Sequence, residues 1–116
     1  MTPTVTDLIR DYYRAYETGD RAVVEKFLSP DFTFTSPLDD RIDRAAYFAR
    51  CWQYHEQVRS FQLHQVAVTG SHALIRYRAE TVDGDSFCNV EHFELDDHHV
   101  THIDVYFGSL PDSDPS

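Results

Sequence analysis

The hydrophobic pattern of this chain changes its period once, near residue 58. Before that point apolar residues recur at steps of three and four, and after it they alternate with polar residues. The first pattern is typical of amphipathic helices and the second of strands with one buried face. Helices that precede a run of consecutive strands indicate an α+β domain, in which the helices cover one face of an antiparallel sheet.

The first helix is expected within the segment TVTDLIRDYYRAYETGD. Either Thr4 or Thr6 can serve as its N-cap, and Gly19 supplies a stop signal at its end. The helical period of the apolar side chains turns Tyr12 and Tyr16 toward the interior.

Two shorter helices are expected after the first. Asp20 can cap the second helix, which ends at the Ser-Pro pair of residues 29–30. The segment DFTFTSP is expected to form a brief strand, and SPLDDRID is rich in turn formers and predicts a loop. Asp43 can cap a third helix, whose aromatic stripe includes Phe48 and Trp52.

Four strands are expected after residue 58, in the segments VRSFQLHQVAV, HALIRYRAETV, SFCNVEHFEL and VTHIDVYFG. The short connections TGS, DGD and DDHH suit antiparallel hairpins, so the strands should form a meander. A chain of 116 residues is large enough for one domain with its own core. We place this domain at residues 1–110 and expect the polar residues 111–116 to be a flexible C-terminal tail.

The register of the last two hairpins, which join the second expected strand to the third and the third to the fourth, decides on which side of the sheet Glu91 lies. Simple two-residue turns would align Glu91 with Arg76 and Asp104 in a charged row. Burial of several large apolar side chains outweighs an exposed ion pair of roughly 0 to 1 kcal/mol, so we expect one extra residue at each turn, with a bulge at Gly84. The predicted inward face then consists of Ile75, Tyr77, Ala79, Asn89, Glu91, Phe93, Ile103, Val105 and Phe107.

The sequence resembles the SnoaL-like branch of the nuclear transport factor 2-like superfamily over about residues 5–108. The resemblance rests on the order of the expected elements and above all on EHFEL followed by IDVYFG. It implies a cone-shaped fold, in which three N-terminal helices pack on a curved antiparallel sheet around a deep pocket. Steroid isomerases, polyketide cyclases, epoxide hydrolases, dehydratases and binding modules share this fold, so the fold alone does not select a function.

Within this superfamily, the resemblance to ketosteroid isomerase implies a site that binds a carbonyl group. Glu91 precedes HF in its strand as the family's acid does, and Tyr12 lies seven residues before Gly-Asp, at the place of the family's oxyanion tyrosine. The family's base is the aspartate of an Asp-Pro pair, and Ser36 replaces it here. Asp39 and Asp40 follow a few residues later and could both reach the mouth of the pocket, and we take Asp40, or a bound water, as the candidate base.

The residues around Glu91 support a pocket independently of the resemblance. A carboxyl group among apolar side chains loses hydration, which raises its pKa and favours the neutral form that donates a hydrogen bond. The alternative to a ligand-binding role is a structural one, in which Glu91 is buried and its carboxyl group only hydrogen-bonds Tyr12, Tyr16 or Asn89. The candidate ligand-binding residues are Tyr16, Phe34, Ser36, Phe48, Trp52, Tyr77, Asn89, Phe93, Val105 and Phe107.

Two functional classes remain open at this point. The first is an isomerase, cyclase or hydrolase that acts on a small apolar carbonyl compound with Glu91, Tyr12 and Asp40 as catalytic residues. The second is a ligand-binding or dimerisation module without catalysis. A purely structural role ranks third, and a pocket filled by Tyr12, Tyr16 and Trp52 would favour it.

Composition excludes several other classes of protein. The net charge of −10 argues against nucleic acid or an anionic membrane as partner. Cys51 and Cys88 have no motif spacing and no signal peptide precedes them, so we expect a cytoplasmic protein without a disulfide framework. His98, His99 and His102 straddle a turn and should diverge, and we therefore expect no metal site and no cofactor.

A homodimer is expected through the outer face of the sheet. Charged and aromatic side chains on that face can meet their copies across a two-fold axis. The predicted outward set is Arg76, Arg78, His92, Asp104 and Tyr106.

Overall fold

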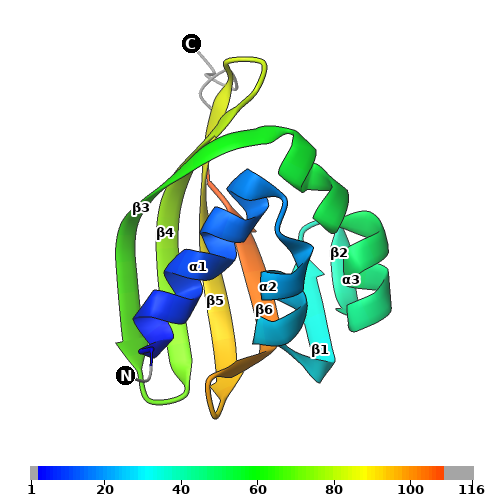
Figure 1. Cartoon of the computed structure of the whole chain (residues 1–116), viewed down its shortest axis with the longest axis vertical. Coiled ribbons are helices and arrows are strands. Elements are labelled where there is room, and N and C mark those ends of the chain that lie inside the picture. The colour runs from blue at the N-terminus through cyan, green and yellow to red at the C-terminus, as the bar shows by residue number, and fades with distance from the viewer. Residues whose placement is uncertain (1–2, 109–116) are drawn as a thin grey trace.

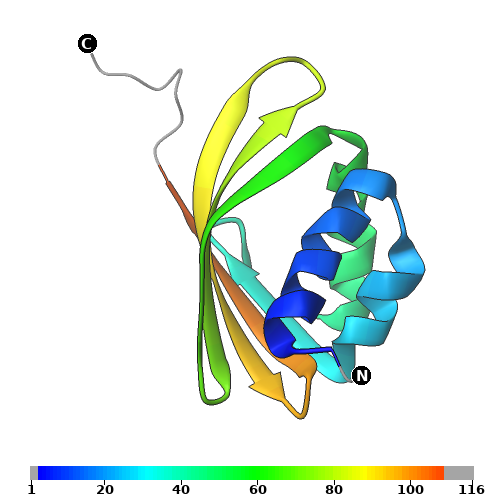
Figure 2. The same ribbon diagram turned by 60° about the vertical axis from the view of Figure 1, so that its left-hand side comes forward.

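The fold consists of a layer of helices on one face of a curved sheet, as the computed structural model of residues 3–108 shows (Figures 1 and 2). The helices are α1 (Val5–Thr18), α2 (Arg21–Phe27), α3 (Arg44–Arg50) and the 3₁₀ helix η1 (Trp52–Glu56). The strands are β1 (Leu28–Ser36), β2 (Asp39–Asp43), β3 (Val58–Thr69), β4 (His72–Thr81), β5 (Ser86–Asp96) and β6 (His99–Phe107). The expected α+β class is confirmed, and the predicted tail lies outside the described residues.

The strand order in the single sheet is β2-β1-β6-β5-β4-β3. β1 runs parallel to β6, and every other pair of neighbouring strands is antiparallel. The C-terminal strand therefore lies inside the sheet, between an early strand and the meander. Among the described helices, none combines the length and the apolar character that a bilayer crossing requires.

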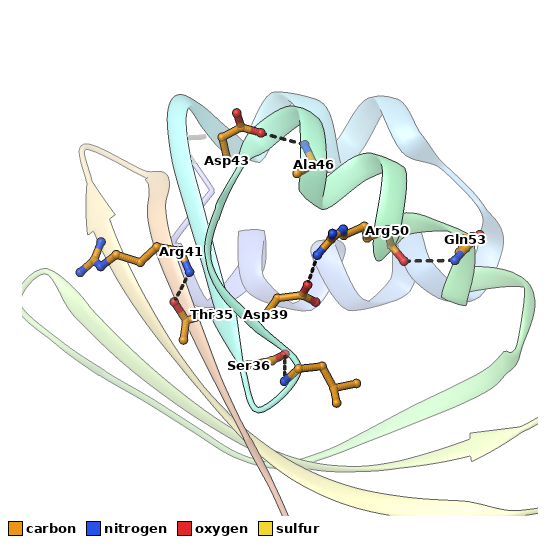
Figure 3. Close-up of polar contacts among 9 residues, drawn as sticks. Thr35, Ser36, Asp39, Arg41, Asp43, Ala46, Arg50 and Gln53 are labelled. Atoms are coloured by element: carbon orange, nitrogen blue, oxygen red, sulfur yellow. Dashed lines mark hydrogen bonds and ion pairs between the residues drawn. The ribbon is translucent and has the colours of Figure 1, made fainter.

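Local capping signals set the ends of the helices. Thr4 caps α1 and forms a reciprocal capping box with Asp7, and Gly19 ends that helix in the left-handed conformation with φ 77°. Asp43 caps α3 by accepting a 2.9 Å hydrogen bond from the Ala46 backbone N–H (Figure 3). Asp20 stands at the N-cap position of α2, but its side chain makes no capping hydrogen bond, so that expected contact is wrong.

The segment SPLDDRID is not the loop that its turn formers predict. Residues Asp39–Asp43 form β2, which pairs with β1 and forms one edge of the sheet. Charged side chains are common on such edges because they discourage pairing with another chain. A polar, charged segment of this kind is therefore compatible both with a loop and with an edge strand whose charges prevent pairing with another chain. β1 is also longer than expected, because it begins at Leu28, before the Ser-Pro pair.

The predicted inward face of the meander is confirmed. Glu91 lies opposite Ile75 on β4 and opposite Val105 on β6. The hairpin of β4 and β5 gains its extra residue at Gly84, which has φ +92° and donates its N–H to the Thr81 carbonyl oxygen at 3.1 Å. The shift in register therefore arises where glycine tolerates the left-handed conformation.

The hairpin of β5 and β6 gains its extra residue differently from the expectation. Its turn has only two residues, Asp97 and His98, both with positive φ. The extra residue is Thr101, because pairing changes from Leu95 opposite Val100 to the next pair on β5 and β6 beyond a bulge. The prediction of one extra residue in this hairpin is correct, but that residue forms a bulge inside β6 and does not lie in the turn.

Candidate functional site

A cavity of about 740 Å³ opens between the helices and the concave face of the sheet. Its volume lies in the range of sites for small molecules, which is about 300 to 1,000 Å³. Exposed Leu38, Tyr54 and Phe107 contribute to its wall and mark its rim. Further tyrosines on the wall come from α1, α3 and β4, and they are Tyr12, Tyr13, Tyr16, Tyr47 and Tyr77.

Glu91 lies on this wall and is only 8% exposed. Its carboxyl group accepts hydrogen bonds from the Tyr13 hydroxyl at 2.9 Å and from the Tyr77 hydroxyl at 2.6 Å. Asn89 donates its side-chain N–H to the Tyr77 oxygen at 3.1 Å and extends the group. We call Glu91, Tyr13, Tyr77 and Asn89 the carboxyl cluster.

Burial raises the pKa of the Glu91 carboxyl above its ordinary value. The hydrogen bonds from Tyr77 and Tyr13 act in the opposite direction, because they stabilise the ionised form. The net direction is upward, so the neutral form persists to higher pH than in a solvated glutamate. This is the electrostatic state that the sequence analysis expects for a carboxyl group in a pocket.

A second group of hydroxyls lies on the same wall. The hydroxyl oxygens of Tyr12 and Tyr47 are 2.6 Å apart, and the Tyr16 hydroxyl also hydrogen-bonds that of Tyr47. Burial raises the pKa of all three tyrosines, which therefore stay neutral and can donate protons in hydrogen bonds. We call Tyr12, Tyr16 and Tyr47 the tyrosine cluster.

Tyr12 and Glu91 both lie on the cavity wall, but the alternative in which Glu91 hydrogen-bonds Tyr12, Tyr16 or Asn89 is not the arrangement in the structure. Tyr12 belongs to the tyrosine cluster, and Tyr13 is the α1 residue that hydrogen-bonds Glu91. Sequence reasoning missed Tyr13 because it assigned a single narrow stripe of α1 to the interior. The spacing of four from Ile9, which is fully buried, could have found it.

The third group on the wall lies beside the β1 to β2 turn (Figure 3). Asp39 forms an ion pair with Arg50 of α3, and the Asp39 side chain is 14% exposed while that of Arg50 is 62% exposed. The Ser36 hydroxyl accepts a 3.1 Å hydrogen bond from the Leu38 backbone N–H. Asp40, the candidate base, is exposed and does not line the cavity. Alternation along β2 explains this difference, since successive side chains point to opposite faces.

The expected ligand-binding residues divide into two sets. Phe48 packs beneath the guanidinium groups of Arg21 and Arg44, and neither Phe48 nor Trp52 lines the cavity. Phe93 is fully buried beside Tyr12 and is likewise not on the wall. The structure brings to the wall Tyr16, Phe34, Ser36, Tyr77, Asn89, Val105 and Phe107.

The three side chains that would favour a purely structural role do not fill the pocket. Tyr12 and Tyr16 line an open cavity, and Trp52 lies behind Tyr16 with a ring distance of 4.8 Å. Among residues 3–108, the side chains that come close enough to share a metal ion are His92, Glu94 and Asp104, and they do not line the cavity.

Comparison with known families matches residues 9–103 to the SnoaL-like domain. Comparison with curated proteins finds no significant relative. Among solved structures, a nuclear transport factor 2-like protein of unknown function from Cytophaga hutchinsonii has a TM-score of 0.75 at 21% identity, with 93% of each chain covered.

Two other solved structures carry functional descriptions. An LEH-like epoxide hydrolase from M. tuberculosis has a TM-score of 0.73 at 20% identity, covering 90% of this chain and 82% of that one. A candidate ketosteroid isomerase from Kribbella flavida has a TM-score of 0.77 at 17% identity, covering 97% of this chain and 83% of that one. At these identities the likeness shows the fold alone.

Proposed function

This chain belongs to the SnoaL-like domain family, and on that premise we propose that it binds a small, mostly apolar carbonyl compound and catalyses proton transfer on it. The observation that carries the proposal is the buried carboxyl group of Glu91 on the wall of the cavity. A carboxyl group with a raised pKa in a cleft is typical of acid and base catalysis.

The carboxyl cluster is suited to bind a carbonyl oxygen. When Glu91 is neutral, its proton can be donated to the oxygen of Tyr13 or Tyr77, and the hydroxyl hydrogen of that tyrosine is then free for a ligand. Hydrogen bonds to such an oxygen strengthen as it gains negative charge in an enolate. Preorganised donors of this kind are worth roughly 3 to 4 kcal/mol in well-studied sites.

Asp39 takes the role of base in this proposal, in place of Asp40. Its carboxylate lies on the cavity wall, and Arg50 holds it there through their ion pair. Ser36 occupies the position of the family's base but has a hydroxyl group, which is a far weaker base than a carboxylate. Asp39 would remove a proton from a carbon next to the carbonyl group while the carboxyl cluster binds the oxygen.

A binding module without catalysis is the second candidate. It is favoured because polar groups on the wall already have partners within the protein. Both carboxyl oxygens of Glu91 accept hydrogen bonds, and Asp39 forms an ion pair with Arg50. In that case the cavity would hold an apolar molecule and leave it unchanged.

Deuterium exchange distinguishes the two candidates without knowledge of the natural substrate. Binding of small cyclic ketones is first measured by the fluorescence of Trp52, the chain's single tryptophan, whose ring packs edge to face against the wall residue Tyr16. The protein is then mixed with a bound ketone in D₂O, and NMR follows exchange of the hydrogens next to its carbonyl group. Catalysis predicts accelerated exchange in the wild type and a loss of at least tenfold in Glu91→Gln and in Asp39→Asn.

Glu80→Gln is the matched control, because it makes the same chemical change on the neighbouring strand β4, at a position that does not line the cavity. It should leave binding and exchange unchanged. Binding without exchange would support the non-catalytic candidate, and absence of binding by the whole ketone series would contradict both.

We also propose a homodimer through the outer sheet face. Leu74 and Tyr106 are large, outward-facing side chains with 49% and 59% exposure, and partner contact would remove that area from water. Sedimentation should show a dimer at micromolar concentration, and Tyr106→Glu should shift the population toward monomer. A wild-type monomer under those conditions would contradict the proposal.

A further inference from the structure

The outer face of the sheet carries a connected group of polar side chains that the cavity does not use. They lie directly opposite one another on neighbouring strands: His72 opposite Glu94, His92 opposite Asp104, and Thr33 and Glu94 on either side of His102. Residues directly opposite one another share a face of the sheet. We call these six residues the outer polar cluster.

Three members of the cluster converge on one point. Ligand atoms of His92, Glu94 and Asp104 all lie within 4.8 Å of one another, and the three residues are half-buried. A transition metal ion at about 2.0 to 2.2 Å from each ligand brings neighbouring ligand atoms to about 3 to 4 Å. The present separations of up to 4.8 Å would have to shorten to that spacing by side-chain rotation when a metal ion binds.

The spacing of His92 and Asp104 fits a shared ion better than a direct hydrogen bond. His92 Nδ1 is 3.6 Å from Asp104 Oδ2. Hydrogen bonds from nitrogen to oxygen usually span about 2.7 to 3.2 Å. The separation is that of two ligands on adjacent positions of one metal ion.

His72 orients the His92 ring for such a role. His72 Nδ1 lies 2.9 Å from His92 Nε2, and the two rings stack with centroids 5.1 Å apart. When Nε2 of His92 carries the proton and donates it to His72, the lone pair of Nδ1 faces the two carboxyl groups. A hydrogen bond from the far ring nitrogen fixes the tautomer in the same way at most metal-bound histidines.

His102 does the same for Asp104. His102 Nε2 lies 2.9 Å from Asp104 Oδ1, and His102 Nδ1 lies 2.7 Å from the Thr33 hydroxyl oxygen. His102 is only 6% exposed, so it is built into the sheet and is not a mobile surface group. It holds one carboxylate oxygen of Asp104 and leaves Oδ2 available.

We propose that His92, Glu94 and Asp104 bind a divalent first-row transition metal ion, with Zn²⁺ as the representative case. One imidazole and two carboxylates, without a thiolate, are a ligand set for such ions. The net charge of −10 also raises the local concentration of cations. His72 and His102 are positioning residues, which act through the ligands that they orient.

This proposal revises the expectation of no metal site. The sequence directs attention to the histidines of the β5 to β6 turn, where His98 and His99 are exposed. The converging ligands lie instead within two paired strands, where only the register brings them together. His92 and Asp104 were both expected on the outer face, but Glu94 had no assigned role.

Equilibrium dialysis tests the site on the full chain without a histidine tag. After treatment with a chelator, the protein is dialysed against Zn²⁺ and the bound metal is measured by atomic emission. We expect one ion per chain, and a loss of affinity of more than tenfold in Glu94→Gln and Asp104→Asn. His102→Gln should weaken binding by about 10- to 100-fold, as loss of an orienting partner does.

The double variant His98→Gln, His99→Gln is the matched control, because it removes one histidine from the neighbouring turn and one from the start of β6, and it should bind Zn²⁺ as the wild type does. Equal loss in this control, or no stoichiometric metal in the wild type, overturns the proposal. NMR of the histidine ring nitrogens provides a test that needs no variant. Addition of Zn²⁺ should shift the Nδ1 signal of His92 more than any signal of His98, and the reverse would also overturn it.

Discussion

At the scale of residues, successive side chains of β5 point to opposite faces of the sheet and carry different chemistry there. Glu91 and Phe93 face the helices, while His92 and Glu94 face outward. The neighbouring positions of one strand thus supply a desolvated acid to the cavity and ligand atoms to the opposite surface. Two kinds of polar chemistry are separated by the thickness of one sheet.

The raised pKa of Glu91 predicts a pH dependence of stability. The neutral carboxyl is favoured in the folded chain, so its contribution is complete below the ordinary value of 4.5 and is lost as pH rises through the folded-state pKa. Glu91→Gln removes this loss, which amounts to about 1.4 kcal/mol for each unit of the shift. Urea unfolding from pH 4 to 8 should therefore show the variant gaining stability relative to the wild type as pH rises. A constant difference would contradict the shift.

The hydrogen bonds around Glu91 predict which tyrosines tune it. Tyr13→Phe and Tyr77→Phe each remove a donor that lowers the pKa of Glu91, so each should raise that pKa further. Tyr12→Phe should change it far less, because Tyr12 makes its hydrogen bond to Tyr47. NMR titration of the Glu91 side-chain carboxyl measures all three. A larger effect of Tyr12→Phe than of the other two variants would contradict this assignment of hydrogen-bond partners.

At the scale of elements, residue preferences predicted helix caps and turns, but they missed the strand that depends on pairing with a segment elsewhere in the chain. The Asp43 cap and the left-handed Gly84 follow from the chemistry of single residues, whereas for α1 local chemistry left Thr4 and Thr6 open and the structure selects Thr4. β2 escaped prediction because its polar residues become a strand only when β1 pairs with them. The choice between Asp39 and Asp40 failed for the same reason, since residues in a presumed loop have no defined face and only Asp39 lies on the wall.

Two aspartates at helix starts predict different losses of stability. Asp43→Ala should cost about 1 kcal/mol, because its side chain caps α3, while Asp20→Ala should cost much less, because its side chain caps nothing. Since α3 carries Arg50, Asp43→Ala should also loosen the ion pair with Asp39. Urea unfolding of both variants checks the difference. Equal losses would mean that the cap contributes nothing specific.

At the scale of the whole molecule, the predicted meander and its inward face are confirmed, but the parallel contact of β1 with β6 was not foreseen. The register of each hairpin can be predicted because apolar residues alternate along its two strands. No local sequence pattern indicates that β1 lies beside β6. The cavity shares this limit, because its wall combines α1, the β1 to β2 turn and the meander.

The strand order predicts a gradient of protection from hydrogen exchange. β6 and β5 have hydrogen-bonded neighbours on both sides, whereas β2 lies at an edge. Amides near Ile103 and Phe93, which are fully buried, should exchange slowest, and those of β2 should exchange by local opening. Native-state exchange followed by NMR measures this gradient. Uniform exchange across the six strands would contradict it.

The placement of β6 between β1 and β5 has a consequence during translation. When β1 and β2 leave the ribosome, the neighbour of β1 on its other side has not yet been made, and it is complete only once Phe107 has emerged. The nascent chain therefore exposes an unpaired strand while residues 44–107 are added, at roughly 5 to 20 residues per second. Within that interval of several seconds, a holding chaperone would meet an open strand edge that the finished protein no longer presents.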